Sequence, residues 1–190
     1  MSDIDILKEM FQDSIKIEIK DHYNQKQVEL QEDKSDYSVT ISGLPDDTLV
    51  IKGDIEKLNH IFKDGASGDQ KGQCRRADFI IFSNIGNKKF IICIELKKCS
   101  STSSEEHIIQ QFKGTLCFLG YCRQMGKEFW RKKDFLETFQ YRFVSIRNIN
   151  VPKKPTFQPP TNGVHATPQK MLKISSPSCP TQFNKLIGKR

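Results

Sequence analysis

Asp78, Glu95 and Lys97 are the residues of this sequence whose types and spacing best suit chemistry. Neighbouring carboxylates repel each other, and partial burial makes each charge costlier. A divalent cation offsets that cost, because Mg²⁺ prefers hard oxygen ligands and is commonly held by one or two carboxylates, waters and phosphates. A lysine beside the pair can orient or deprotonate a water, or stabilise a developing negative charge. Two acids and a lysine around a metal therefore suit phosphodiester hydrolysis.

A β-hairpin would bring these three residues together. Two strongly β-prone segments, 76–83 and 89–97, flank Gly86-Asn87, and glycine first suits a two-residue type II′ turn. In that register Asp78 faces Glu95, with Cβ atoms roughly 5 Å apart. Lys97 shares their face because it lies two residues beyond Glu95. The alternative is a solvated strand end in which Lys97 pairs with Asp78, and a slip of one residue would also change the pairing.

Both faces of this hairpin are apolar, which is typical of central strands covered on each side. One face carries Ile80, Phe82, Ile91 and Cys93, and the other carries Phe79, Ile81, Phe90, Ile92 and Ile94. Hydrophobic periodicity and capping residues predict the elements around it. They are helices over 3–12, 54–63, 105–122 and 128–139, and strands over 15–19, 39–41, 49–51 and 141–149, with a loop or exposed helix over 21–36. We therefore expect an α/β fold with a central mixed β-sheet flanked by helices.

The residues around the hairpin resemble the signature of the PD-(D/E)XK nuclease superfamily, an aspartate at a strand start followed by E-x-K at the end of the next strand. The matching stretches are Arg76-Ala77-Asp78-Phe79-Ile80-Ile81-Phe82 and Ile94-Glu95-Leu96-Lys97. The resemblance covers roughly residues 50–150 and implies the αβββαβ restriction-endonuclease-like core. The chain departs from the pattern at Ala77, where the signature has proline, and it lacks the Q-x-x-x-Y pattern of the RecB-like branch.

The resemblance also implies roles for individual residues. Asp78 and Glu95 would hold Mg²⁺ or Mn²⁺, with the carbonyl of Leu96 as a further ligand, and Lys97 would serve catalysis. Many members carry an acid on the preceding helix, for which Glu56 is the candidate. Some carry a glutamine on the following helix, which Gln110 or Gln111 would supply. Arg75 and Arg76 flank the site and would either touch phosphates or form a solvated strand entry.

The leading hypothesis is metal-dependent cleavage of phosphodiester bonds, with DNA as the expected substrate. Restriction and phage defence are typical settings of small members of the family that it resembles. The alternative is a non-catalytic nucleic-acid-binding or assembly module on the same fold. A third interpretation is a homodimer or a partner protein that docks onto another subunit.

Composition limits the remaining function classes. No stretch of 18 or more apolar residues occurs, so no membrane partner is expected. The first 20 residues carry acids and do not resemble a secretory signal, which favours a cytoplasmic protein. The six cysteines form no C-x-x-C pair, so small buried thiols in a reducing compartment are expected.

The net charge of +7 lies entirely in residues 151–190, which hold seven basic residues and no acid. Residues 1–150 are neutral, with 23 basic and 23 acidic residues, and are expected to form the nuclease-like domain. Seven of the eight prolines also lie in 151–190, which favours a basic, extended tail that contacts nucleic acid. The alternative is that the apolar residues between Met171 and Ile187 pack back onto the body or onto a second copy.

Overall fold

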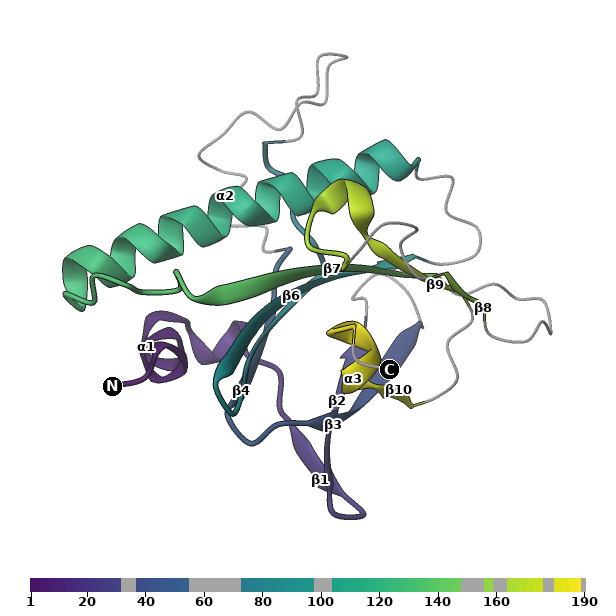
Figure 1. The fold of residues 1–190 in the computed structure, drawn as a ribbon, viewed down its shortest axis with the longest axis horizontal. Helices are drawn as coiled ribbons and strands as arrows, with labels where there is room; N and C mark the ends of the chain where they lie inside the picture. The colour runs from purple at the N-terminus through teal and green to yellow at the C-terminus, as the bar shows by residue number, and fades with distance from the viewer. Residues whose placement is uncertain are drawn as a thin grey trace.

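The computed structural model describes residues 1–31, 37–54, 73–97, 104–147, 156–158, 164–175 and 180–188. Over these residues the chain is a mixed α/β protein with two mixed β-sheets and three α-helices (Figure 1). The larger sheet has the strand order β4-β5-β6-β7-β9-β8, and the smaller one β1-β2-β3-β10. None of the described helices is long and apolar enough to cross a membrane.

The larger sheet is built around the expected hairpin. Its strands are β4 (Thr48–Lys52), β5 (Phe79–Ile85), β6 (Lys88–Lys97), β7 (Phe139–Arg147), β8 (Thr156–Gln158) and β9 (Leu172–Ser175). Strands β4, β5 and β6 are antiparallel neighbours, whereas β7 runs parallel to β6. Parallel neighbours need a long crossover connection, which here contains the helix α2 (Glu105–Phe129).

The register of the hairpin is the one that the turn residues predict. The ladder runs from Ile85 opposite Lys88 to Phe79 opposite Ile94. Gly86 has a φ of +58°, and Asn87 is not among the residues of positive φ. That combination matches a type II′ turn, in which only the first central residue needs the left-handed region. The predicted pairing is therefore confirmed along the whole of β5.

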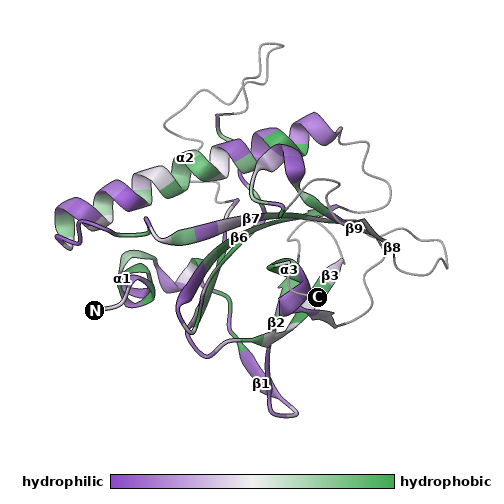
Figure 2. Ribbon diagram, viewed as in Figure 1, coloured by the Kyte–Doolittle hydropathy of each residue, from purple (hydrophilic) through white to green (hydrophobic). Residues whose placement is uncertain are grey.

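Helix α2 covers one face of the larger sheet (Figure 1). It begins after Ser104, whose hydroxyl accepts a hydrogen bond from the backbone N–H of His107. Ile108, Phe112 and Leu119 are buried against β5, β6 and β7. Apolar segments alternate with polar ones along the helix in Figure 2, as expected when one side faces a sheet and the other faces water.

The opposite face of the larger sheet packs against the smaller sheet and the short helix α3 (Phe183–Leu186). The smaller sheet consists of β1 (Lys20–His22), β2 (Gln25–Gln31), β3 (Ser38–Leu44) and β10 (Thr181–Gln182). The shared core on this side contains Ile81, Ile92, Val144 and, from the smaller sheet, Leu30 and Ile41. The hairpin strands are thus covered on both faces, as their apolar pattern predicts.

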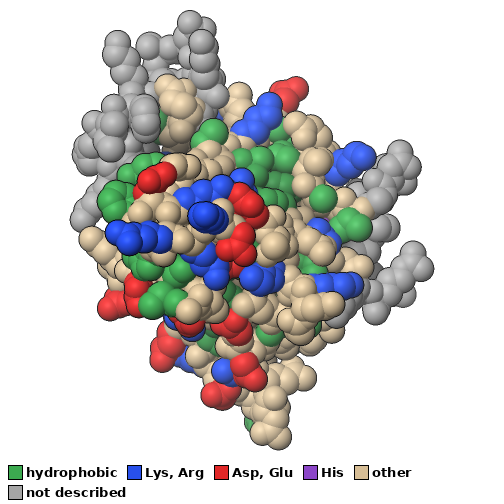
Figure 3. Space-filling view, turned by 60° about the vertical axis from the view of Figure 1, so that its left-hand side comes forward, with side chains coloured by type: hydrophobic (Ala, Val, Ile, Leu, Met, Phe, Trp, Pro, Cys, Tyr) green, Lys and Arg blue, Asp and Glu red, His purple; other side chains and the backbone are tan. Residues whose placement is uncertain are grey.

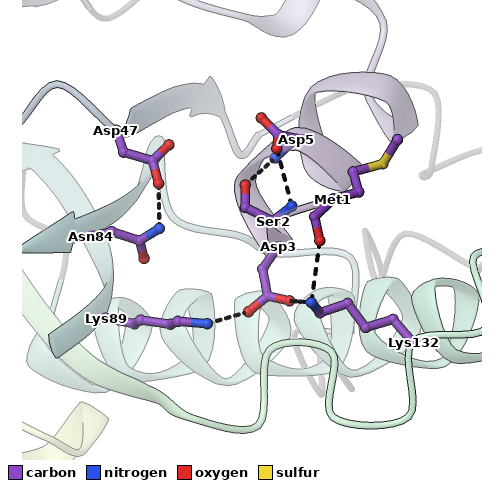
Figure 4. A network of polar contacts seen from close by, with 8 residues as sticks. All are labelled: Met1, Ser2, Asp3, Asp5, Asp47, Asn84, Lys89 and Lys132. Atoms are coloured by element: carbon purple, nitrogen blue, oxygen red, sulfur yellow. Dashed lines mark hydrogen bonds and ion pairs between the residues drawn. The ribbon is translucent and has the colours of Figure 1, made fainter. Parts of the chain in front are cut away.

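Helix α1 (Asp3–Met10) is anchored by a buried carboxylate. Asp3 is 2% exposed and lies between the ammonium groups of Lys89, at 2.9 Å, and Lys132, at 3.4 Å (Figure 4). On the side of the molecule that Figure 3 turns forward, basic and acidic side chains are interspersed near the centre. Charges of both signs side by side compensate one another locally, so this region does not form a patch of one sign.

The described parts of residues 151–190 belong to both sheets. Strand β9 pairs with β7 in parallel, and β10 pairs with β3 in parallel. Leu172 and Leu186 are fully buried, and Phe183 is 1% exposed. An extended tail is therefore wrong for these residues. They follow the alternative in which the segment around 171–187 packs onto the body, because its apolar residues supply enough surface to bury.

Three other expectations are wrong for local reasons. Residues 15–19 form no strand beyond a single bridge between Lys16 and Ile51. Residues 20–31 form the β1–β2 hairpin rather than a loop or helix, with a turn in which Tyr23 and Asn24 have positive φ. Helix α2 continues to Phe129, and turns rather than a second helix follow it.

The other predicted elements occur close to their expected bounds. The predicted helix over 3–12 corresponds to α1, and the strands predicted at 39–41, 49–51 and 141–149 correspond to β3, β4 and β7. The helix predicted over 54–63, including Glu56, lies outside the described residues apart from Asp54.

Candidate active site

Asp78 and Glu95 meet where β5 begins and β6 approaches its end. Asp78 lies one residue before the first ladder pair, so the register places it opposite Glu95. The backbone N–H of Asp78 donates to Glu95 Oε2 at 3.3 Å. The backbone N–H of Leu96 donates to Asp78 Oδ2 at 2.7 Å. These two crossed hydrogen bonds hold both carboxyl groups at the same end of the sheet.

Glu95 is a fully buried acid, with 0% of its surface exposed. Burial, and after it the negative charge of Asp78, raises its pKa from 4.5 to about 8. The charge of Lys97 and hydrogen bonds from Lys97 and Gln111 act in the opposite direction. The net effect favours the protonated form of Glu95. Keeping both Asp78 and Glu95 ionised would therefore need a positive charge in addition to that of Lys97.

Lys97 forms an ion pair with Glu95 Oε1, and its side chain is 13% exposed. The sequence left open whether Lys97 would pair with Asp78 at a solvated strand end. The structure places the ammonium group on the buried glutamate. The predicted acid, acid and lysine are therefore in one place, and the lysine is next to the carboxylate whose ionisation costs most.

Helix α2 supplies the predicted glutamine. Gln111 hydrogen-bonds to the Glu95 carboxyl group, and its side-chain Nε2 also donates to the backbone oxygen of Arg76 at 3.4 Å. Gln110, the other candidate, instead accepts a hydrogen bond from Arg75 at 3.1 Å. Of the two glutamines, Gln111 is the one that contacts the acids.

Residues that the sequence did not single out fix the segment before Asp78. Thr115 on α2 accepts a hydrogen bond from the backbone N–H of Ala77 at 2.8 Å. The N–H of Gly53, just after β4, donates to the backbone oxygen of Asp78 at 2.8 Å. A Cβ on Gly53 would lie 2.3 Å from the oxygen of Ala77, so the contact requires glycine. Neither residue carries a sequence signal, because each acts through a contact that only the fold creates.

Arg76 has a structural role. It is 4% exposed, its Nε donates to the oxygen of Gly53 at 2.8 Å, and its guanidinium lies 3.9 Å from Asp54. A side chain this buried does not offer its guanidinium to a phosphate in solvent, so the expectation that Arg76 touches phosphates is wrong. Arg75, which is half-buried, remains on the outer side of the site.

The donor set fits a hard divalent cation. Asp78 and Glu95 provide two carboxylates, and Mg²⁺ is commonly held by that number together with waters and substrate phosphates. Within the described residues, no group of three histidine, cysteine, aspartate or glutamate side chains gathers around one point. Waters and substrate phosphates would complete the ligands of such a site. The predicted ligation by the Leu96 carbonyl and the role of Glu56, which lies outside the described residues, remain predictions.

A different part of the molecule contains an open hollow of about 630 Å³, around the tip of the β1–β2 hairpin. Its lining includes Asp21, His22, Lys26 and Asp46. Lys26 and Asp46 form an exposed ion pair at 3.2 Å. The acids at the end of the larger sheet, where burial and the charge of Asp78 raise the pKa of Glu95, have the stronger chemical rationale.

Comparisons of this chain with protein-family models, with curated proteins and with solved structures found no match.

Proposed function

We propose that this protein is a divalent-metal-dependent nuclease that hydrolyses phosphodiester bonds in DNA. The observation that carries the proposal is Glu95, a fully buried acid held against Asp78 and Lys97 at the end of two central strands. A buried acid next to a second carboxylate is costly for the fold. Perturbed acids of this kind are concentrated at functional sites.

The order of elements supports a restriction-endonuclease-like core. Helix α1, the antiparallel strands β4, β5 and β6, helix α2 and the parallel strand β7 follow the αβββαβ order, with β1 to β3 between α1 and β4. Asp3, the buried acid of α1, lies at the opposite end of β6 from the candidate site, so it cannot take the role predicted for Glu56. Asp3 binds Lys89 near the start of β6, eight residues from Lys97 and thus roughly 26 Å away along the strand.

The residues at the site divide the work of hydrolysis. Asp78, Glu95 and the Leu96 carbonyl would hold Mg²⁺ or Mn²⁺, which supplies Lewis-acid polarisation of a phosphate oxygen. Gln111 keeps the Glu95 carboxyl group oriented by its hydrogen bond. Lys97 positions the attacking water and stabilises the negative charge that develops on the phosphate.

The ammonium group of Lys97 lies against the Glu95 carboxyl group. It lowers the pKa of Glu95, but burial and the charge of Asp78 outweigh it, so the carboxyl group keeps its proton without a cation. With that proton released to water, Asp78 and Glu95 would hold a divalent cation, since carboxylates are favourable ligands for it. Lys97 lies next to Glu95 and is placed to act on the substrate.

Cleavage of plasmid DNA tests the proposal. Wild-type protein with Mg²⁺ or Mn²⁺ should cleave, and EDTA should stop cleavage. Glu95→Gln and Lys97→Ala should remove activity. The matched control is Glu128→Gln, an exposed glutamate at the far end of α2, which should cleave like wild type. DNA binding without metal-dependent cleavage by the wild type would contradict the nuclease and favour a binding module.

A further inference from the structure

The carboxyl ends of three parallel strands lie side by side next to the candidate site. The register pairs Lys97 on β6 with Arg147 on β7, and it pairs Ser145 on β7 with Lys173 on β9. We propose that Arg147 and Lys173 bind the phosphates next to the one held at Lys97, so that the DNA backbone crosses the sheet end from β6 towards β9. This assignment rests on the proposed nuclease function and names a substrate-binding path for it.

The core fixes the face on which these side chains lie. Side chains alternate between the two faces of a strand. Phe143 of β7 and Met171, just before β9, pack in the core beneath α2, whereas Val144 and Leu172 pack in the core against the smaller sheet. Arg147 is four residues from Phe143 and Lys173 is two from Met171, so both lie on the face that carries Glu95 and Lys97.

The spacing suits successive contacts along one strand of nucleic acid. Neighbouring strands in a sheet are about 5 Å apart, which places the backbone at Arg147 roughly 5 Å from Lys97 and that of β9 roughly 10 Å away. Long arginine and lysine side chains can cover the remaining distance between these backbone positions and the phosphates of the nucleic acid. Arginine can also bind two phosphate oxygens at once through its planar guanidinium.

The metal-binding acid of β5 and the proposed phosphate-binding residues lie on opposite sides of Lys97. Asp78 lies on one side, where Asp54 is already beside Arg76, and Arg147 and Lys173 lie at β7 and β9 on the other. A cation is favoured on the first side and a phosphate on the second. The backbone of a bound strand would therefore extend away from the acids.

Both basic residues are accessible to such a ligand. Arg147 is half-exposed and forms no ion pair within the described part of the chain. Lys173 pairs with Glu105 at 2.6 Å, but the side chains are 45% and 52% exposed. Exposed pairs of this kind are weak, so a phosphate can replace Glu105 as the partner of Lys173.

The test measures binding of a short fluorescent DNA duplex in EDTA across a range of salt concentrations, so that no cleavage is needed. Each phosphate contact contributes about −0.9 to the log–log slope of affinity against salt. Arg147→Ala should make the slope shallower by about 0.9, and adding Lys173→Ala should double that change. Arg147→Lys should keep most of the slope, because the charge remains. Lys88→Ala removes an exposed charge at the opposite end of β6 and should leave the slope unchanged.

Melting temperatures check that each variant is folded, and kinetics on the cleaving enzyme provide a second readout. Arg147→Ala should raise KM with little change in kcat, since the contact is remote from the bond that breaks. An unchanged slope in folded Arg147→Ala, or an equal change in Lys88→Ala, would overturn the path while metal-dependent cleavage by the wild type still stood. If the wild type does not cleave DNA with metal, the nuclease proposal is wrong. The salt slopes of the variants would still show whether Arg147 and Lys173 bind phosphates.

Discussion

Replacing Glu95 by glutamine should remove a pH dependence of stability that the wild type shows without metal. The ordinary pKa of this side chain is 4.5, and burial beside Asp78 raises it to about 8. The folded state thus keeps a proton that the unfolded state releases. Stability is full below the unfolded pKa and falls as the pH rises through the window between the two values. Glutamine does not ionise, so the variant should show no such loss.

The size of the effect follows from the change in pKa. Each unit corresponds to about 1.36 kcal/mol, so a rise from 4.5 to about 8 amounts to a loss on the order of 5 kcal/mol across the window. For a chain of this length, about 2–4 °C of melting temperature corresponds to each kcal/mol. The wild type should therefore lose roughly 10 °C relative to Glu95→Gln between pH 4.5 and pH 8.

Thermal melts in EDTA at several pH values measure this difference, because titrating groups away from Glu95 affect both proteins alike. Glu128→Gln, which removes an exposed acid, should keep the wild-type profile. Adding Mn²⁺ should flatten the profile of the wild type, since a cation compensates the ionised acids as protonation does. Parallel profiles for wild type and Glu95→Gln in EDTA would refute the buried, proton-holding glutamate.

Three further outcomes concern the metal, the long helix and the C-terminal strands. Mn²⁺ at a hundredfold excess over its Kd should stabilise the wild type by about 2.7 kcal/mol, and melting temperatures should show no such gain in Asp78→Asn. In denaturant titrations, Gly120→Ala should stabilise α2 by about 0.5–1 kcal/mol because its Cβ meets open space. Gly126→Ala should instead destabilise by about 1–3 kcal/mol, because its Cβ would lie 2.0 Å from a buried ring. Leu172→Ala should cost about 2–5 kcal/mol, since Leu172 is fully buried.

Each of these outcomes has a direct contradiction. Equal metal stabilisation of wild type and Asp78→Asn would remove Asp78 from the ligands. Two glycine variants of equal stability would mean that Phe135 does not pack against α2 as the structure has it. Val164→Ala, at a position that is 48% exposed, is the control for Leu172→Ala. Similar small losses in both would show that β9 is not part of the core.

The parts of the fold that the sequence predicts well are those that depend on local patterns. Gly86-Asn87 determines the turn, and the turn determines the register that brings Asp78 opposite Glu95. The capping serine at 104 and the apolar stripe after it predict where α2 begins. Lys97 shares the face of Glu95 because side chains alternate along a strand. These relations are carried by residues close together in the chain.

The parts that the sequence predicts poorly depend on contacts between distant segments. Strand β9 becomes a strand because it pairs with β7, and its flanking prolines suggest the opposite. The turns after α2 are fixed by Phe135 and Leu136, which are buried although the segment has helical periodicity. Arg76 looks like a surface arginine in the sequence, and the approach of Gly53 gives it an internal partner.

The pairing of β10 with β3 has a consequence for how the protein folds during synthesis. Thr181 lies beside Ile41, and the side chain of Gln182 donates to that of Ser42 across 140 positions of sequence. Contacts this far apart in the chain slow folding, because a long loop must close before they form. The smaller sheet also remains open along one side of β3 until residues 181–182 have left the ribosome. That exposed edge would be able to pair with other chains, so chaperones that shield unpaired strand edges would matter most before these two residues emerge.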